Sequence, residues 1–325
     1  MEFEFIKVHG SGNDFLLIDE LFNKELFPEE ERTKAARLLC DRENGPGADG
    51  ILFIQKSEHA DARMRVFNAD GSEASMCGNG LRCAGRYVCE KLGRDSAIIE
   101  TMKANLTVQK FPEISEGVAT FNVEISPVSF KLKDLPLNLK QESLLNGEIA
   151  ELSEDLRFTA MAVPNPHLIA IVEESDLRGA LQKELSENVN GPNELFSDGV
   201  NVSFVKPLAE GHIYVRTFER GVGFTNACGT AMSASSLVTC LNGLNEIDRP
   251  ISVYNDGGMV QCIVRSIEGS YKIELIGNAT FLYRARANVD VSSGSSRFDE
   301  VENYGEQERY SFLQNKAQQF LAEHK

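Results

Sequence analysis

The chain has 325 residues, enough for two domains of roughly 100–200 residues each. Its 42% hydrophobic and 25% charged residues are typical of a globular protein with a buried core. A formal net charge of −16 argues against nucleic acid as a partner. The apolar runs are too short to span a bilayer, and the acidic start lacks the basic and apolar regions of a signal peptide. We therefore expect a cytoplasmic protein with no membrane or nucleic-acid partner.

Short strands and a few helices account for most of the predicted structure. Apolar patterns bounded by Gly, Asn, Asp or Pro predict strands over residues 3–8, 15–19, 50–55, 63–68, 97–101, 106–109 and 119–125. The acidic stretch after Pro28 predicts a helix over residues 29–40, because acidic side chains are favourable at a helix N-terminus. Apolar spacing predicts further helices over residues 78–91, 229–241 and 310–320, and we assign the last of these no catalytic role.

An internal repeat divides the chain. Three short motifs recur in the same order, whereas a single match of this length arises easily by chance. They pair Asn13 with Asn165 (offset 152), Asp49 with Asp198 (offset 149) and Cys77 with Cys228 (offset 151). We therefore expect two similar domains, over residues 1–135 and 136–285, and a C-terminal extension over residues 286–325. A cleft between two such domains is a preferred place for a small-molecule site.

Two of the seven cysteines stand out. An odd number of cysteines in a large chain with no export signal argues against a disulfide framework, and the sequence has no Cys-x-x-Cys pair typical of a zinc site. Five cysteines are interpreted as small buried hydrophobic residues. Cys77 and Cys228 differ because each precedes a predicted helix. Unpaired N–H groups and the helix dipole at such a position are expected to lower the pKa of a thiol.

Two such thiols at equivalent positions fit one kind of reaction. Inverting a carbon centre by proton transfer needs a base on one face and an acid on the other, and a pair of thiols supplies both. The small residues after each cysteine, Gly78-Asn79-Gly80 and Gly229-Thr230-Ala231, leave helix-start N–H groups accessible to a carboxylate. We therefore predict inversion of an amino acid without a cofactor or metal. The alternative is that the two cysteines have no joint role.

Polar residues near these motifs are candidates for substrate contacts. Four asparagines lie at strand ends, where asparagine is also common as a turn residue: Asn13, Asn68, Asn165 and Asn201. Glu219 and Arg220 shortly precede Cys228. An arginine can bind a carboxylate with two hydrogen bonds and a glutamate can bind an ammonium group, although the two residues could equally form a solvated ion pair.

Longer motifs resemble the diaminopimelate epimerase family, and the stretch around Cys228 resembles its Gram-positive branch. The matching stretches are His9-Gly-Ser-Gly-Asn-Asp-Phe, Gly47-Ala-Asp-Gly, Phe67-Asn-Ala-Asp-Gly-Ser-Glu-Ala-Ser-Met-Cys-Gly-Asn-Gly-Leu-Arg-Cys, Pro164-Asn-Pro-His, Asp198-Gly-Val-Asn and Glu219-Arg-Gly-Val-Gly-x-x-x-Ala-Cys-Gly-Thr. The resemblance extends over residues 3–283. It implies interconversion of LL- and meso-diaminopimelate in the synthesis of lysine and peptidoglycan precursors.

The resemblance also implies an α+β fold of two pseudo-symmetric domains, each a curled, mostly antiparallel sheet around a central helix, with no pyridoxal phosphate and no metal. It makes Cys77 and Cys228 the catalytic acid and base. His167 and Glu219 would modulate their pKa values, and Tyr283 would lie in the contact of a homodimer. The implied substrate contacts are Asn13, Asn68, Gly78, Asn79, Asn165, Asn201, Glu219, Arg220, Gly229 and Thr230.

Four positions depart from patterns found in the family. Phe224 replaces a Glu, and Pro164 and Ala231 each replace a Gly. Gly50 stands where some members use a Gln that contacts the ligand, so no side-chain contact is expected there. The departures near Cys228 bear on the geometry of the bound substrate, and both thiols are retained.

Other functions fit parts of the pattern. The protein could invert another amino acid, such as proline, histidine or glutamate. A thiol redox protein is an alternative of a different class, and it would form a disulfide between Cys77 and Cys228 during turnover. A thiol hydrolase would leave the duplicated cysteine unexplained. A non-catalytic amino-acid-binding module would need neither thiol.

Overall fold

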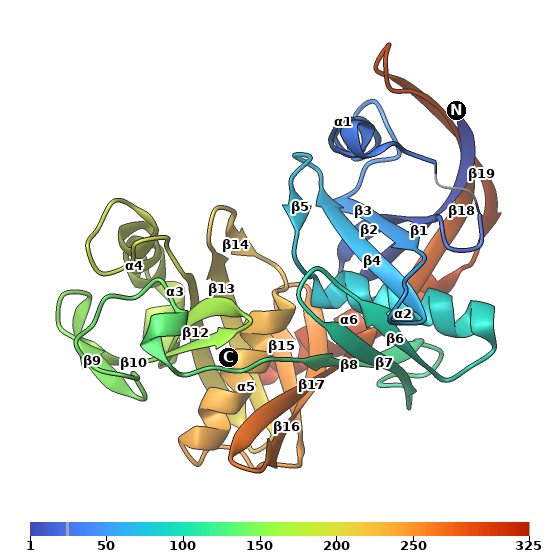
Figure 1. The fold of residues 1–325 in the computed structure, drawn as a ribbon. Helices are drawn as coiled ribbons and strands as arrows, with labels where there is room; N and C mark the ends of the chain where they lie inside the picture. Colours follow the sequence, from blue (N-terminus) through green and yellow to red (C-terminus); the bar gives the residue numbers. More distant parts are fainter. Residues whose placement is uncertain (24–25, 325) are drawn as a thin grey trace. The chain divides into compact units, whose positions relative to one another are not determined.

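The computed structural model describes residues 1–23 and 26–324, which form two compact units (Figure 1). The first unit comprises Met1–Val123 and Ile276–Leu313, and the second comprises Glu124–Leu275 and the residues from Gln314 onward. This division differs from the boundaries expected at residues 135 and 285. The chain returns to the first unit because a late strand, β18 (Thr280–Asp290), pairs along β1 (Glu2–Gly10).

The first unit is a curled sheet with helices on both faces. Its other strands are β2 (Asn13–Asp19), β3 (Gly50–Gln55), β4 (Ala62–Asn68), β5 (Glu73–Ala74), β6 (Ser96–Glu100), β7 (Asn105–Phe111) and β19 (Ser295–Asn303). Its helices are α1 (Glu29–Leu39), α2 (Gly78–Leu92) and the first part of α6 (Glu306–His324). The β2–β3 and β4–β6 pairs are parallel, whereas β1–β2, β1–β18, β3–β4 and β6–β7 are antiparallel.

The second unit repeats this order of elements. Its strands are β9 (Gly147–Ile149), β10 (Ser153–Val163), β11 (Asn165–Ile171), β12 (Asn201–Ala209), β13 (His212–Glu219), β14 (Gly223–Thr225), β15 (Pro250–Asn255) and β16 (Gly258–Ile267). Its helices are η1 (Leu132–Asp134), α3 (Glu174–Arg178), α4 (Leu181–Asn190) and α5 (Gly229–Leu241). The chain passes from one unit to the other within β8 (Thr120–Ile125), within β17 (Ser270–Asn278) and again within α6, between Leu313 and Gln314.

The repeat predicted from the sequence is present in the strand pairing. β11 and β12 are parallel, as are β13 and β15, which matches the parallel pairs of the first unit. The register is also equivalent, because Phe15 pairs with Gly50 in one unit and His167 with Asn201 in the other. The expected α+β class, with a mostly antiparallel curled sheet in each half, is therefore confirmed.

Each sheet curls around one helix. α2 contacts β1, β2, β3, β4, β6 and β7, and α5 contacts β10, β11, β12, β13, β15 and β16. Every residue of α2 from Gly78 to Cys89 is buried. Gly85 shows how closely the sheet approaches, because a Cβ at this position would lie 2.2 Å from Cγ1 of Val108. Small residues dominate α5, which is buried from Gly229 to Thr239.

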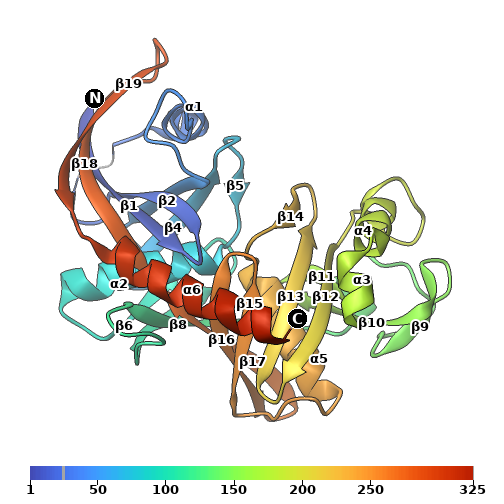
Figure 2. The ribbon, with the colours of Figure 1, turned by 180° about the vertical axis from the view of Figure 1, so that it is seen from behind.

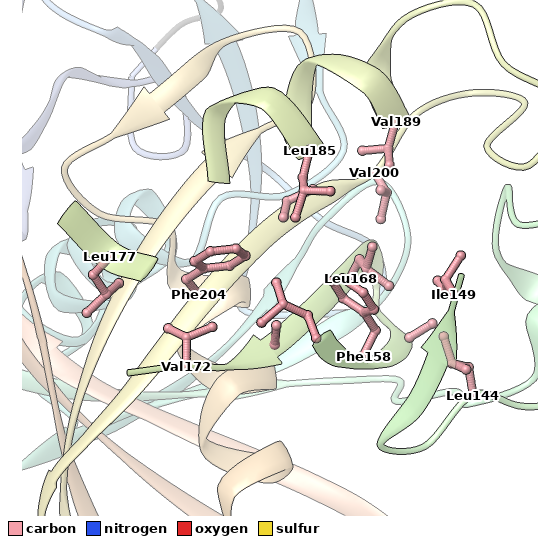
Figure 3. Packing of buried hydrophobic residues seen from close by; sticks show 14 of the residues in the cluster. Leu144, Ile149, Phe158, Leu168, Val172, Leu177, Leu185, Val189, Val200 and Phe204 are labelled. Carbon is pink, nitrogen blue, oxygen red and sulfur yellow. The ribbon is translucent and has the colours of Figure 1, made fainter. Parts of the chain in front are cut away.

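Strand alternation decides which residues face the central helix. Successive side chains of a strand point to opposite faces of the sheet. In the second unit, Leu168 and Phe204 belong to an apolar cluster beneath α3 and α4 (Figure 3). His167, one position before Leu168, and Asn201, three positions before Phe204, therefore point to the other face, which α5 covers. In the first unit, Leu16 belongs to the cluster beneath α1, so the alternation places Asn13 on the face covered by α2.

The C-terminal helix predicted near residues 310–320 is present and longer than expected. α6 begins at Glu306, and its residues Tyr310, Leu313, Ala317 and Leu321 are buried. Figure 2 shows its N-terminal end beside α2. None of the helices that the structure describes combines the length and the apolar character that a membrane crossing requires.

Candidate active site

Cys77 occupies the N-cap position of α2. Its backbone is extended, with φ −140° and ψ 114°, and its carbonyl oxygen accepts the first helical hydrogen bond, from Leu81 N–H at 2.8 Å. Cys77 Sγ accepts a hydrogen bond from Gly80 N–H at 3.5 Å, so the sulfur fills the place where a serine or aspartate oxygen commonly caps a helix. The N–H groups of Gly78 and Asn79 belong to the same first turn and have no intrahelical acceptor. The predicted helix start at Cys77 is confirmed.

Asn13 lies beside this thiol. The Cys77 thiol donates to Asn13 Oδ1 at 3.6 Å, and Asn79 Nδ2 donates to the same oxygen at 3.3 Å. Asn13 Nδ2 donates to Asp49 Oδ2 at 2.7 Å. The structure thus joins two predicted site residues, Asn13 and Asn79, to Cys77. It also adds Asp49, which the sequence marked only as part of a repeated motif.

Arg82 was missed by the sequence reasoning. Its guanidinium is fully buried, and Nη2 donates to Asn79 Oδ1 at 2.9 Å and to Ser11 Oγ at 3.0 Å. Nε donates to the carbonyl oxygen of Asn278 at 3.0 Å. Arg82 therefore fixes the orientation of the Asn79 amide, which in turn contacts Asn13. The available signal was its place in the quoted Cys77-Gly-Asn-Gly-Leu-Arg-Cys motif, on the first turns of the predicted helix.

Cys228 occupies the equivalent N-cap position of α5. Its backbone is extended, with φ −116° and ψ 107°, and its carbonyl oxygen accepts from Met232 N–H at 3.0 Å. Its side chain is buried, and Sγ lies 3.5 Å from Thr230 Oγ1. The same hydroxyl lies 3.1 Å from Nε2 of His167, which is completely buried. Gly229 and Thr230 form the start of the helix, as the sequence predicts.

Burial controls the ionisation of Cys228 and of His167. The pKa of the Cys228 thiol is raised well above its ordinary value, first by burial and then by the negative charge of Glu219, although Thr230 Oγ1 and Ala231 N–H partly oppose this. The expectation that the helix start lowers this pKa is wrong for Cys228, because desolvation outweighs the helix dipole. Burial also lowers the pKa of His167 to about 3, so its imidazole is neutral.

Glu219, Arg220 and Asn201 lie close together in the second unit. Asn201 Oδ1 accepts from Arg220 N–H at 2.9 Å, and Glu219 accepts from Thr225 Oγ1. Arg220 Nη1 forms an ion pair with Asp198 Oδ2 at 2.5 Å and donates to the Asp198 carbonyl at 2.8 Å. Asp198 is a further residue that the sequence marked only as a motif. In this structure, Arg220 is thus occupied by a carboxylate of the protein itself.

Three other predicted residues have different surroundings. Asn68 ends β4, and its side chain donates to Ser72 Oγ at 3.0 Å, as expected of a turn residue. Asn165 begins β11 opposite Val163. Tyr283 lies in β18 and packs edge to face on Phe5, with ring centroids 6.2 Å apart. Their roles in substrate binding and in a homodimer contact stay predictions.

The departures from the family pattern have local explanations at two positions. A Cβ at position 50 would lie 2.5 Å from the carbonyl oxygen of Phe67, so this sheet leaves no room for a side chain there. Phe224 packs edge to face on Phe218 at 5.2 Å, and the guanidinium of Arg216 lies 4.0 Å above its ring. Ala231 is buried in the first turn of α5. Nothing in the structure explains Pro164.

Across residues 1–23 and 26–324, no three His, Cys, Asp or Glu side chains are arranged to hold a metal ion together. All seven cysteines are thiols. Each unit, taken by itself, has a thiol at a helix start with helix-start N–H groups beside it, and in the first unit Asn13 contacts that thiol. Such groups can bind a carboxylate and transfer a proton.

Comparison with known proteins identifies the family. The sequence model described as diaminopimelate epimerase matches residues 5–123 and 159–282. The chain belongs to the diaminopimelate epimerase family. The diaminopimelate epimerase of Ligilactobacillus salivarius is 50% identical over 319 residues, covering 94% of this chain and 97% of that protein. That of Listeria welshimeri is 48% identical, with 98% and 97% covered. The family predicted from the motifs is confirmed, and the protein is an isomerase.

Solved structures with similar folds are more distant in sequence. A PhzF-family phenazine biosynthesis protein of Bacillus anthracis has a TM-score of 0.62 at 17% identity, covering 89% of this chain and all of that one. A hydroxyproline epimerase of Agrobacterium vitis has a TM-score of 0.56 at 14% identity, covering 88% and 92%. At these identities the likeness supports the fold alone.

The two thiols should differ in reactivity. Without substrate, we expect iodoacetamide to alkylate Cys77 faster than Cys228, because Cys77 is less buried and the pKa of Cys228 is raised. Glu219→Gln should increase the rate at Cys228 by about tenfold, since it removes a negative charge that raises this pKa. Peptide mass spectrometry measures both rates. Glu210→Gln, an exposed change in the same unit, is the control, and equal Cys228 rates in all three proteins would contradict the assignment.

Proposed function

We propose that this protein interconverts LL- and meso-diaminopimelate, with Cys77 and Cys228 as the two proton-transfer groups. Membership of the diaminopimelate epimerase family, at 48–50% identity over nearly the whole chain, supports the substrate. One observation supports the mechanism most directly: both thiols occupy the same N-cap position in two equivalent units. The product serves lysine and peptidoglycan precursor synthesis.

The proposed reaction needs one thiolate and one thiol at the same time. A thiolate removes the proton from the α-carbon of the substrate, and the opposite thiol donates a proton to the other face of that carbon. The starting charge states are exchanged in the reverse reaction. In the resting protein Cys228 is the protonated partner, because burial and Glu219 raise its pKa. We therefore assign Cys77 as the base toward the isomer whose α-proton faces it.

Helix-start N–H groups stabilise the charge that develops during this transfer. Removing the α-proton moves negative charge onto the substrate carboxylate, and the N–H groups of Gly78, Asn79, Gly229 and Thr230 belong to the first turns that are suited to receive it. Buried His167 is neutral and reaches the Cys228 thiol through the Thr230 hydroxyl. This contact orients the thiol rather than supplying charge.

The remaining polar residues are proposed to recognise the two amino-acid groups of the substrate. Arg220 binds a carboxylate and Glu219 an ammonium group, while Asn13 and Asn201 provide amide contacts. Asn68 and Asn165 are further candidates. We also propose that the chain acts as a homodimer with Tyr283 at the contact, which light scattering of the purified protein tests.

Incubation with single stereoisomers in heavy water tests the proposed function. We expect LL-diaminopimelate to be converted to the meso isomer, with deuterium incorporated at the inverted α-carbon, and chiral chromatography with mass spectrometry measures both. Conversion of proline, histidine or glutamate without conversion of diaminopimelate would assign a different substrate. If neither diaminopimelate nor any of the other amino acids exchanges its α-proton for deuterium, proton transfer as the mechanism would be contradicted.

A further inference from the structure

The first turn of α6 contacts both elements that bring Cys77 and Asn13 together. α6 begins at Glu306, beyond residue 282, where the match to the family model ends. Its part up to Leu313 belongs to the first unit. Gln307 contacts the β1–β2 hairpin, whose turn leads directly into Asn13, and Glu306 contacts α2, which begins after Cys77. These two contacts are made to His9 and Arg86, not to Cys77.

Gln307 fixes the state of a buried histidine in the hairpin. His9 Nδ1 accepts from Gly12 N–H at 3.2 Å and lies 3.3 Å from Asn278 Nδ2, which is also a donor. The proton of neutral His9 must therefore be on Nε2, which lies 3.1 Å from Gln307 Oε1. Burial lowers the pKa of His9 to about 4, in keeping with a neutral ring. The ring of Tyr310 packs on it edge to face at 4.5 Å.

The hairpin turn needs this support because its backbone is strained. Ser11 and Gly12 join β1 to β2, and both have positive φ, 55° and 79°. This matches a two-residue turn of type I′, in which serine is an unfavourable first residue. Side chains hold Ser11 there, because its N–H donates to Asn278 Oδ1 at 2.8 Å and its hydroxyl accepts from Arg82. Asn13 follows directly.

Glu306 holds α2, the helix that begins directly after Cys77. Its two carboxylate oxygens accept from Arg86 Nη1 and Nη2 at 2.6 and 2.7 Å, which is a bidentate ion pair. Glu306 Oε2 also accepts from Phe281 N–H at 2.9 Å. Arg86 lies in the middle of α2 and donates to the carbonyl of Ala279 as well. Adjacent residues of α6 thus bind the hairpin and the helix.

We propose that the first turn of α6 is a clamp that sets the position of Asn13 against Cys77, with Gln307 and Glu306 as positioning residues. Gln307 holds the turn through His9, and Glu306 holds α2 through Arg86. The effect on catalysis rests on the proposed function, whereas the effect on the Cys77 thiol does not. Displacing Asn13 removes an acceptor from the thiol and exposes it to reagents.

Gln307→Leu tests the clamp by removing the acceptor for His9 Nε2–H while keeping a side chain of similar size. We expect Cys77 alkylation by iodoacetamide to become about fivefold faster as the turn opens locally, with Cys228 unchanged in the same sample. The kcat/KM for diaminopimelate should fall by about tenfold, because small displacements in a site reduce rates strongly. Gln319→Leu is the matched control, since Gln319 lies in the same helix and its side chain donates to the exposed Glu323.

Two results would overturn the clamp: an unchanged Cys77 rate in folded Gln307→Leu, or equal changes at Cys77 and Cys228, which indicate general destabilisation. Gln307→Glu provides a second test and decides alone if Gln307→Leu does not fold. Its carboxylate still accepts from His9 Nε2–H, so at a pH of about 8 the Cys77 rate should equal that of the unmodified protein. Failure of diaminopimelate conversion in the unmodified protein would contradict the proposed function and leave the alkylation result valid.

Lowering the pH should separate Gln307→Glu from the unmodified protein. The negative charges of Asp14 and Glu306 already raise the pKa of His9, whereas burial and Arg82 lower it. The new carboxylate at position 307 adds a further negative charge and should therefore raise this pKa. Protonation of His9 at Nδ1 would replace the acceptor of Gly12 N–H with a second N–H donor. The two donors would repel each other and weaken the turn. Between a pH of about 8 and about 6, the Cys77 rate relative to the unmodified protein should therefore rise. A constant ratio would count against the clamp.

Discussion

Cys77→Ser and Cys228→Ser should each lower the rate of diaminopimelate inversion by at least about 10³-fold. A serine hydroxyl has nearly the size of a thiol and can still cap a helix, so the fold should be preserved. Its pKa is far too high for it to serve as a base at neutral pH. Because inversion needs both groups, loss of either one should abolish it.

Hydrogen exchange separates the two halves of the reaction. Each variant keeps one thiol, so in heavy water it should still exchange the α-proton of the isomer that presents this proton to the remaining thiol, without inverting it. Cys240→Ser is the control, because Cys240 lies at the far end of α5 and is only partly buried. Full inversion by both Cys77→Ser and Cys228→Ser would rule out the two-thiol mechanism.

The sequence was sufficient to place both thiols. A run of small residues after Cys77 and Cys228, followed by helical periodicity and a stop near Gly93 or Asn242, is a local signal, and helix starts depend on local chemistry. The repeat added the equivalence of the two positions. Strand alternation then determines that Asn13 and His167 face the central helices, since a shift of one residue would bury the wrong face.

The burial of individual side chains and their long-range contacts could not be predicted from the sequence. Arg82 lies in a helix that is buried almost all round, and only the tertiary structure shows that Asn79, Ser11 and Asn278 accept hydrogen bonds from its guanidinium. The raised pKa of Cys228 has the same origin, because desolvation depends on what surrounds the thiol and not on its position in the helix.

The return of the chain to the first unit was also beyond local reasoning. β18 pairs with β1 along residues more than 270 positions apart, such as Phe5 and Ala285. Nothing in the pattern of residues 280–290 identifies β1 as its partner. The expected C-terminal extension from residue 286 was for this reason placed outside the domains, although β19 and the first part of α6 belong to the first unit.

Arg220→Met should lower kcat/KM for diaminopimelate by about 100-fold, mainly through KM, if this guanidinium binds a substrate carboxylate. The structure shows Arg220 paired with Asp198, but the side chain of Asp198 is 80% exposed. An exposed ion pair contributes at most about 1 kcal/mol, so a substrate carboxylate can replace Asp198 at little cost. Steady-state kinetics with LL-diaminopimelate measures the change.

Asp198→Asn probes the same exchange from the other side. Removing the competing charge leaves Arg220 available, so KM should fall by about two- to fivefold while kcat changes little. Arg249→Met is the matched control, because Arg249 is 75% exposed and pairs with Glu246, three residues before it in the chain. A KM that Arg220→Met leaves unchanged would remove Arg220 from substrate recognition and limit it to holding the loop at Asp198.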